Sequence, residues 1–267
     1  MFVLIKRVGG NVERKKQMDR PRCIFCLTTD KTKFNTKEHI IPESLGSGDW
    51  AILPEGLFCD DCQNIFGSSI EQQALAVYPL SNFRTFFGIP TKKGKAPWFS
   101  FWEGKLQSGG DVGKLIYEPN KIFKKAFESG EKTLSIIPAM PEKSNMVMRT
   151  LLKIGLETFA ADLSTKDEIF EPKFDAARKY ALLGKKDNPW FYIVNENIAI
   201  LNSYLKGITE KEWINNFYSD VHEEGDLIYL HLKLLYLDFF VPLIDNVEMD
   251  NNYKESLKEP ETRIVYV

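Results

Sequence analysis

Four cysteines near the start of the chain have the residue type and the spacing of a metal site. Cys23 and Cys26 form one C-x-x-C pair, and Cys59 and Cys62 form a second. Each pair places two thiolates at one tight turn, and two pairs supply the four soft ligands of a closed tetrahedral zinc site. The chain has no other cysteine. The sequence therefore predicts one structural zinc ion held by four thiolates.

A second group of reactive residue types lies between the two pairs. Thirty-two residues separate Cys26 from Cys59, more than the roughly 15–20 of a simple zinc ribbon, so we expect a folded unit there. This unit contains Glu38 and His39, and Pro42 follows shortly after. A carboxylate is a hard ligand for a divalent ion. An imidazole is largely neutral near pH 7 yet basic, which suits a general base.

This arrangement resembles the HNH nuclease family, in the branch whose ββα-metal core is clamped by a four-cysteine zinc. The resemblance covers about the first ninety residues, a third of the chain. It is specific, because two cysteine pairs flanking E-H-I-I-P are much rarer than either feature alone. The matching residues are Cys23, Cys26, Glu38-His39-Ile40-Ile41-Pro42, Ser44-Leu45-Gly46, Cys59, Cys62 and the region of Asn64, with Ile70-Glu71 on the following helix.

The resemblance implies a metal-dependent endonuclease that hydrolyses phosphodiester bonds, with DNA as the first expectation. His39 takes the place of the base that activates water, and Glu38 that of a ligand for a catalytic divalent ion, Mg²⁺ or Mn²⁺. The family usually places Asn or His directly after the last cysteine as a further ligand. This chain has Gln63 there and Asn64 next. Either amide oxygen could complete the site, with Asn64 slightly favoured, and a degraded site with weak or absent catalysis is a third possibility.

Two further alternatives stay open. Glu71 lies seven residues after Asn64, on the same face of a regular helix; it could bind metal, orient a partner or be solvated, and a structural or solvated carboxylate is favoured. The alternative function is a catalytically weak or inactive zinc module on an HNH scaffold that binds nucleic acid or protein, which the departure at Gln63 supports. A redox role for C-x-x-C would need a βαβ context, and neither pair has one.

The elements around the motif must hold the histidine against the amide-bearing helix. We expect a strand at 36–41 that Pro42 closes, and a helix from Cys62 to about Val77, where apolar residues recur at helical spacing. The zinc ion would fix these two elements relative to each other, because a core of this size buries too little apolar surface alone.

The sequence predicts an α+β fold in two domains. Residues 1–95 would form the HNH nuclease domain with its structural zinc. Residues 96–267 would form an α+β domain with an antiparallel sheet and two or three helices, for substrate positioning, oligomerisation or regulation. We expect helices at 144–163, 174–183 and 210–217, a hairpin of 98–106 with 113–118, and strands at 134–137, 190–194, 198–201, 227–235, 236–244 and 263–267.

Composition narrows the class of protein. A hydrophobic content of 43% suffices for a packed core, and no apolar run is long enough for a membrane span, so we expect a cytoplasmic protein without a membrane partner. Residues 1–100 carry 14 Lys/Arg against 10 Asp/Glu, a basic excess that fits contact with nucleic acid. Restriction or phage defence is the setting that the resemblance suggests; a homo-oligomer or a defence-system partner is left open.

Overall fold

The computed structural model describes residues 20–91, 93–110, 114–129, 143–162, 167–205, 217–245 and 262–267. The elements expected at 134–137 and, apart from its last residue, at 210–217 lie outside these ranges. The fold is α+β, as predicted, with two antiparallel sheets. Its α-helices are α1 (Asp60–Ile65), α2 (Gln72–Ala74), α3 (Leu80–Phe86), α4 (Lys121–Glu128), α5 (Ser144–Ala161), α6 (Asp175–Leu183) and α7 (Ile198–Leu205).

The chain before α1 is built from turns rather than from a regular strand. The strand expected at 36–41 is reduced to one antiparallel bridge between His39 and Ile52, beside which the Leu53 amide donates to the Glu38 carbonyl at 2.9 Å. After Pro42 the chain turns into a 3₁₀ turn at Glu43–Leu45. The prediction of a regular strand was wrong, because the Thr36 amide donates to the Asp60 carboxylate and the Lys37 carbonyl accepts from Gln63, so neither group pairs with a neighbouring strand.

A nearly continuous helix follows the second cysteine pair. It consists of α1, a π-helical stretch at Phe66–Glu71, and α2. The predicted helix is therefore confirmed, although it begins at Asp60 rather than at Cys62. Asp60 and Asp61 occupy the first turn, where negative charge stabilises a helix through its dipole. The π-helical stretch departs from regular i→i+4 bonding, a feature frequent at functional sites.

A five-stranded antiparallel sheet forms the second half, in the order β5-β6-β7-β4-β8. Its strands are β4 (Phe191–Glu196), β5 (Phe217–Glu224), β6 (Leu227–Leu234), β7 (Leu237–Pro242) and β8 (Thr262–Tyr266), the last at an edge as predicted. The strand expected at 198–201 was wrong, because α7 begins there. The Asn197 side chain accepts the Ile200 amide at 2.9 Å, and such a cap starts a helix.

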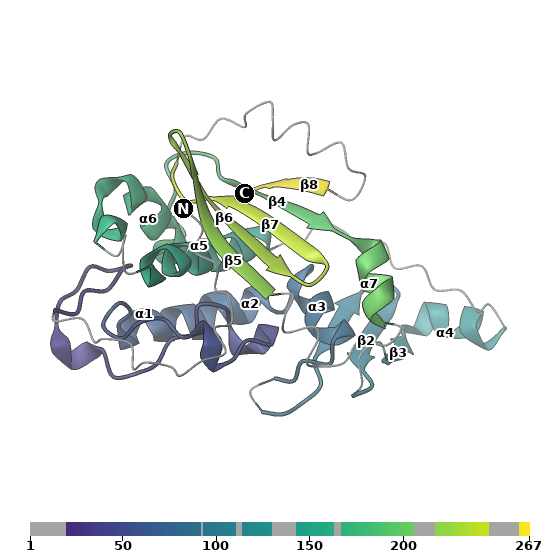
Figure 1. Ribbon diagram of the computed structural model, residues 1–267. Coiled ribbons are helices and arrows are strands. Elements are labelled where there is room, and N and C mark those ends of the chain that lie inside the picture. The colour runs from purple at the N-terminus through teal and green to yellow at the C-terminus, as the bar shows by residue number, and fades with distance from the viewer. Residues whose placement is uncertain are drawn as a thin grey trace.

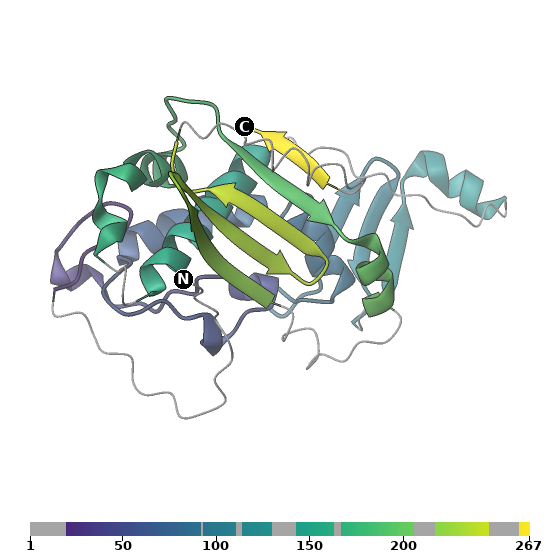
Figure 2. The same ribbon diagram turned by 45° about the horizontal axis from the view of Figure 1, so that its top comes forward.

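Helix α5 lies between this sheet and the helix that α1 and α2 form (Figures 1 and 2). It is buried over almost its whole length, from Val147 to Ala160, as expected of a helix packed on both sides. Close approach to the sheet depends on Gly155, because a Cβ there would lie 2.5 Å from Leu243 Cδ2. Among the helices of the described ranges, none is both long and apolar enough to cross a membrane.

A smaller sheet stands at one end of the molecule (Figure 1). It consists of β1 (Trp98–Phe101), β2 (Gly104–Ser108) and β3 (Leu115–Pro119) in that order. The predicted hairpin therefore contains one strand more than expected, because residues 98–106 turn back on themselves at Trp102 and Glu103. Tyr78, Phe99 and Leu106 form its own small core. Helix α3 contacts this sheet and lies between it and the helix α1–α2.

Candidate functional site

The two C-x-x-C turns meet in space. The Sγ atoms of the four cysteines all lie within 4.8 Å of one another. Those of Cys26 and Cys59 are 3.5 Å apart. The turns are joined by backbone pairing, in which the Ile24 amide donates to the Leu57 carbonyl at 2.9 Å. The cysteines form no disulfide. The predicted convergence of the four thiols is therefore confirmed.

The cysteine cluster fits a zinc ion. Tetrahedral zinc with Zn–S bonds of about 2.3 Å requires sulfurs about 3.8 Å apart, which matches this spacing. A hydrogen bond from Cys62 lowers the pKa of Cys23 to about 5, whereas burial raises that of Cys59 to about 12. The thiols thus oppose one another's ionisation, and a bound cation would relieve this opposition.

His39 is held at its backbone on two sides. It forms the bridge with Ile52, and its carbonyl accepts a hydrogen bond from Lys153 Nζ at 3.3 Å. Its ring nitrogen Nε2 lies 3.6 Å from Glu43 Oε1 and has no hydrogen-bond partner within the described part of the chain. These contacts therefore fix the backbone of His39, while its ring nitrogen Nε2 is buried and makes no hydrogen bond to a described residue.

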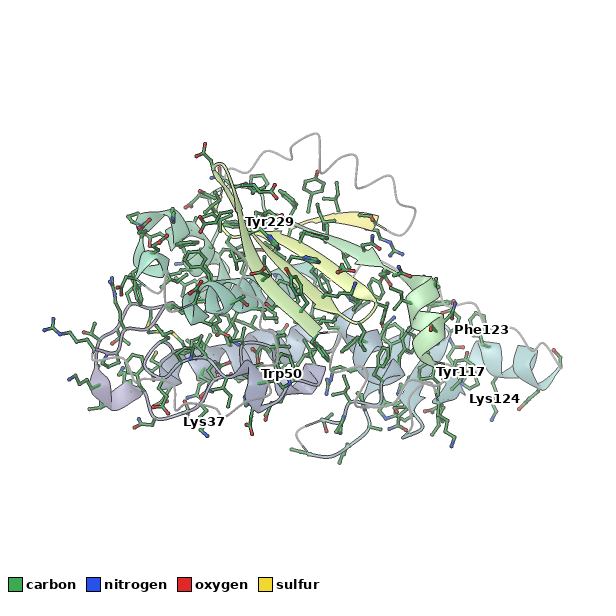
Figure 3. All side chains as sticks on the ribbon, in the orientation of Figure 1. Lys37, Trp50, Tyr117, Phe123, Lys124 and Tyr229 are labelled. Carbon is green, nitrogen blue, oxygen red and sulfur yellow. The ribbon has the colours of Figure 1, made fainter. Side chains whose placement is uncertain are left out.

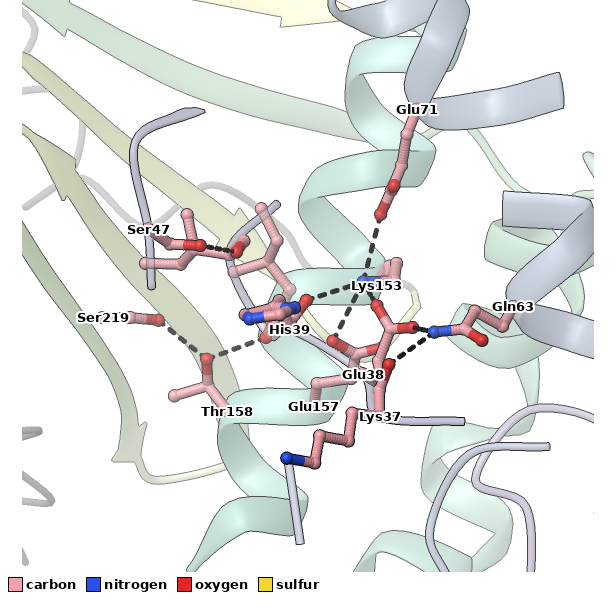
Figure 4. Close-up of polar contacts among 12 residues, drawn as sticks. Lys37, Glu38, His39, Ser47, Gln63, Glu71, Lys153, Glu157, Thr158 and Ser219 are labelled. Carbon is pink, nitrogen blue, oxygen red and sulfur yellow. Dashed lines mark hydrogen bonds and ion pairs between the residues drawn. The ribbon is translucent and has the colours of Figure 1, made fainter. Parts of the chain in front are cut away.

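Glu38 has both carboxylate oxygens engaged by donors. Lys153 Nζ lies 2.7 Å from Oε1, and Gln63 Nε2 donates to Oε2 at 2.7 Å. The same Gln63 nitrogen donates to the Lys37 carbonyl at 2.7 Å. Because both neighbours are acceptors, the amide nitrogen of Gln63 must face them and its oxygen points elsewhere (Figure 4). Gln63 thus orients Glu38, and each carboxylate oxygen keeps a further lone pair.

Lys153 is the centre of this polar cluster, although the sequence did not single it out. Its fully buried Nζ lies 2.7 Å from Glu38, 3.1 Å from Glu71 and 3.1 Å from Glu157 (Figure 4). Burial alone would lower the pKa of Lys153, but these three carboxylates raise it well above its usual value. Burial raises the pKa of Glu157 far above the usual range, against the effect of Lys153.

The structure gives Glu71 a role that the sequence could not decide. Its side chain is only 15% exposed and pairs with Lys153, so it is structural rather than solvated. Asn64 is exposed, and no hydrogen bond to its side-chain amide is found among the described residues. The two amides predicted as alternatives thus differ: Gln63 is engaged with Glu38, and Asn64 is not.

Glu38, His39, Gln63, Asn64 and Glu71 line one cleft of about 990 Å³. The same cleft is lined by Arg84 from α3, by Lys93 and Lys95 from the segment before β1, and by Trp98 at the start of β1. The sequence did not place Arg84 in the site, because it is not among the motif residues that carry the resemblance. A signal for Lys153 existed: Lys153 and Glu157 stand four residues apart within an otherwise apolar helix.

Comparison with known proteins supports the resemblance. Residues 23–78 match the model of the HNH endonuclease family. This range contains the four cysteines, Glu38, His39 and both amide residues, so the match and the cysteine cluster together confirm a zinc-clamped HNH domain in this part of the chain. No curated protein and no solved structure gives a significant match.

Proposed function

We propose that the chain is a metal-dependent HNH endonuclease that hydrolyses phosphodiester bonds, with DNA as the substrate to test first. An HNH domain indicates nuclease function on nucleic acid. One observation supports the proposal most strongly: Glu38 and His39 line a single cleft with Asn64 and with the cations Arg84, Lys93 and Lys95. The cysteine cluster joins the parts of the chain before and after Glu38 and His39.

In this proposal His39 is the general base. One nitrogen of its ring accepts the proton of a water molecule as that water attacks phosphorus. The Glu43 carboxylate, 3.6 Å from Nε2, then stabilises the imidazolium that results. The bridge to Ile52 and the hydrogen bond from Lys153 hold the backbone that carries the ring, which matters because misplacement of a catalytic group by about 1 Å can cost about a hundredfold in rate.

Glu38 and the amide oxygen of Asn64 would hold the divalent ion, with Gln63 as the alternative to Asn64. Oxygen donors of this kind suit Mg²⁺ or Mn²⁺. When bound, the ion would stabilise the charge that develops on the phosphate and on the leaving oxygen. Lys153 and the Gln63 amide orient Glu38. Even without Glu157, whose pKa burial raises, two carboxylates lie against one ammonium, and this excess of negative charge favours a further cation nearby.

The decisive experiment is plasmid nicking with Mg²⁺ or Mn²⁺. We expect cleavage by the wild type and none above background by His39→Ala, while zinc content and the far-UV circular dichroism spectrum stay unchanged. His222→Ala is the matched control, because His222 is half-buried on β5 and does not line the cleft; it should cleave like the wild type. Equal cleavage by wild type and His39→Ala would refute the role of His39.

A second candidate function rests on a specific observation. Both oxygens of Glu38 are already engaged, by Lys153 and by Gln63, an arrangement that can be stable without a second metal. A zinc module that binds nucleic acid without cutting it would retain zinc and DNA binding yet cleave under no divalent ion. A setting in restriction or phage defence, a cytoplasmic location and a homo-oligomeric state stay predictions.

A further inference from the structure

Arg84 is a buried cation without an anionic partner. It is 8% exposed, and its Nε atom has no hydrogen-bond partner in the described ranges. Its one hydrogen bond there is long, from Nη2 to the Pro90 carbonyl at 3.5 Å. Burial lowers the pKa of its guanidinium, and no carboxylate offsets this effect.

This isolation contrasts with the other buried cations. Lys153 is surrounded by three carboxylates, and Arg178 pairs with Asp175 and donates to backbone carbonyls. Removing a charge from water without a partner is costly, so buried charges are normally paired. An unpaired guanidinium that lines a cleft therefore indicates a missing anion.

The surroundings of Arg84 define which anion would fit. Lys93 and Lys95 line the same cleft, and neither has an ion pair with any residue that the structure describes. Trp98, which also lines the cleft, is 43% exposed. Lys37 lines the cleft near His39 and projects from the surface in Figure 3. A cleft with several cations and an exposed indole is typical of sites for single-stranded nucleic acid.

We propose that Arg84, assisted by Lys93 and Lys95, binds a phosphate of the substrate strand other than the one that is cut, and that Trp98 stacks on an adjacent unpaired base. This inference rests on nucleic acid being the substrate, as proposed above. The planar guanidinium matches two phosphate oxygens at once. Stacking on Trp98 requires an unstacked base, so the ligand is a single strand or an unpaired segment, such as a supercoiled plasmid exposes, rather than a continuous relaxed duplex.

The test measures binding rather than cleavage. A fluorescently labelled single-stranded oligodeoxynucleotide is titrated with His39→Ala protein in Mg²⁺, and anisotropy is followed at several salt concentrations. Adding Arg84→Gln should weaken binding about tenfold, a typical loss for one charge-assisted hydrogen-bonded contact. It should also make the slope of log K against log salt shallower by about 0.7, the effect of one phosphate contact on a single strand. Arg84→Lys should keep most of that slope.

Four further variants guard against an effect on folding. Lys93→Gln with Lys95→Gln changes exposed side chains and should also reduce the salt slope, whereas Lys105→Gln, exposed on β2 outside the cleft, should not. Trp98→Ala should weaken binding of the single strand. Trp102→Ala is its matched control, because Trp102 is 74% exposed and does not line the cleft.

The outcomes separate this inference from the proposed function. If Arg84→Gln and the double lysine variant bind with wild-type affinity and salt slope, the inference is overturned, even when the wild type cleaves DNA. If these variants lose affinity while the wild type cleaves under no divalent ion, the binding site stands and the nuclease proposal fails. Equal affinity for duplex and single strand, with no effect of Trp98→Ala, would overturn the stacking contact.

Discussion

A single ammonium group connects the main polar residues of the site. Lys153 Nζ contacts the carboxylates of Glu38, Glu71 and Glu157 and the carbonyl of His39. Each of these acceptors comes at a different place along the chain, so the position of one side chain determines the positions of several others. Removing one partner from such a buried group leaves uncompensated charges.

We predict that Lys153→Met destabilises the protein by about 3–5 kcal/mol, the usual cost of breaking a buried ion pair. Lys179→Met is the matched control, because Lys179 and Asp187 are also 2.7 Å apart but exposed; exposed pairs contribute at most about 1 kcal/mol. Denaturant unfolding of both variants measures the difference. Similar losses in the two variants would show that burial of the ammonium does not matter.

A second prediction separates the two amides. Asn64→Asp should retain metal-dependent cleavage, because a carboxylate can replace an amide oxygen as a ligand. Gln63→Glu should lower the cleavage rate about tenfold or more, because it removes the donor that orients Glu38. Cleavage rates over a range of Mg²⁺ concentrations measure both effects. The reverse pattern would assign the ligand to Gln63.

The sequence predicted correctly the site residues whose type and spacing fit a single kind of chemistry. The four cysteines were predicted to converge, and they do. The pairing of Gln63 with Glu38 was not predicted, because the motif argues for amide oxygen and the structure presents amide nitrogen. Arg84 was missed because a lone basic residue has no periodic pattern and its burial depends on distant elements. Lys153 was missed although its spacing to Glu157 was a signal, because that spacing does not show which other carboxylates it meets.

At the scale of elements, the close packing of α5 on the large sheet depends on one residue without a side chain. A Cβ at Gly155 would lie 2.5 Å from Leu243 Cδ2 and 3.2 Å from Leu230 Cβ. Gly67, also helical, has no atom within 4 Å of such a Cβ. The two glycines therefore separate the intrinsic helix preference of alanine from its effect on packing.

We predict opposite effects for the two alanine substitutions. Gly67→Ala should stabilise the protein by about 0.5–1 kcal/mol, the helix preference of Ala over Gly. Gly155→Ala should destabilise it, because overpacking typically costs about 1–3 kcal/mol and both neighbours are buried. Thermal unfolding measures both. Stabilisation by Gly155→Ala would mean that α5 and the sheet can move apart, or that Leu243 can shift, at little cost in free energy.

Periodicity predicted the long elements and failed at the short ones. Helix α6 ends at Gly184 in the left-handed conformation, as its sequence indicated, and α5 ends within two residues of the predicted position. The segment after Asn197 is apolar, and its pattern fits a strand and a helix equally well. The capping hydrogen bond from the Ile200 amide to the Asn197 side chain favours the helix. The pairing of His39 with Ile52 is a single bridge. It is too short to give an alternating pattern of apolar and polar residues in the sequence around His39.

At the scale of the whole molecule, the second half of the chain takes part in the site. Lys153 comes from α5, which packs against both the large sheet and the π-helical stretch after α1. A division into domains at residue 95 stays a prediction, but these contacts cross it.

We predict that residues 1–95 alone do not form a stable nuclease. The fragment would expose the apolar surface that α5 covers and leave Glu38 and Glu71 without Lys153. The fragment should bind zinc but show neither cooperative thermal unfolding nor cleavage. The full chain of residues 1–267 should show both cooperative unfolding and cleavage. A fragment that unfolds cooperatively and cuts DNA would make the second half dispensable for the chemistry.

The π-helical stretch at Phe66–Glu71 has a consequence for how side chains are aimed. In a regular helix, successive residues turn by about 100°, so Gln63 and Glu71, eight residues apart, would diverge by about 80°. A π turn absorbs one residue, and the divergence falls to about 20° by the same geometry. Both side chains can then reach the same cluster, Gln63 at Glu38 and Glu71 at Lys153. Deleting one residue within this stretch would give a regular helix in which Gln63 and Glu71 stand seven residues apart and still diverge by about 20°, so Glu71 should keep its contact with the ammonium.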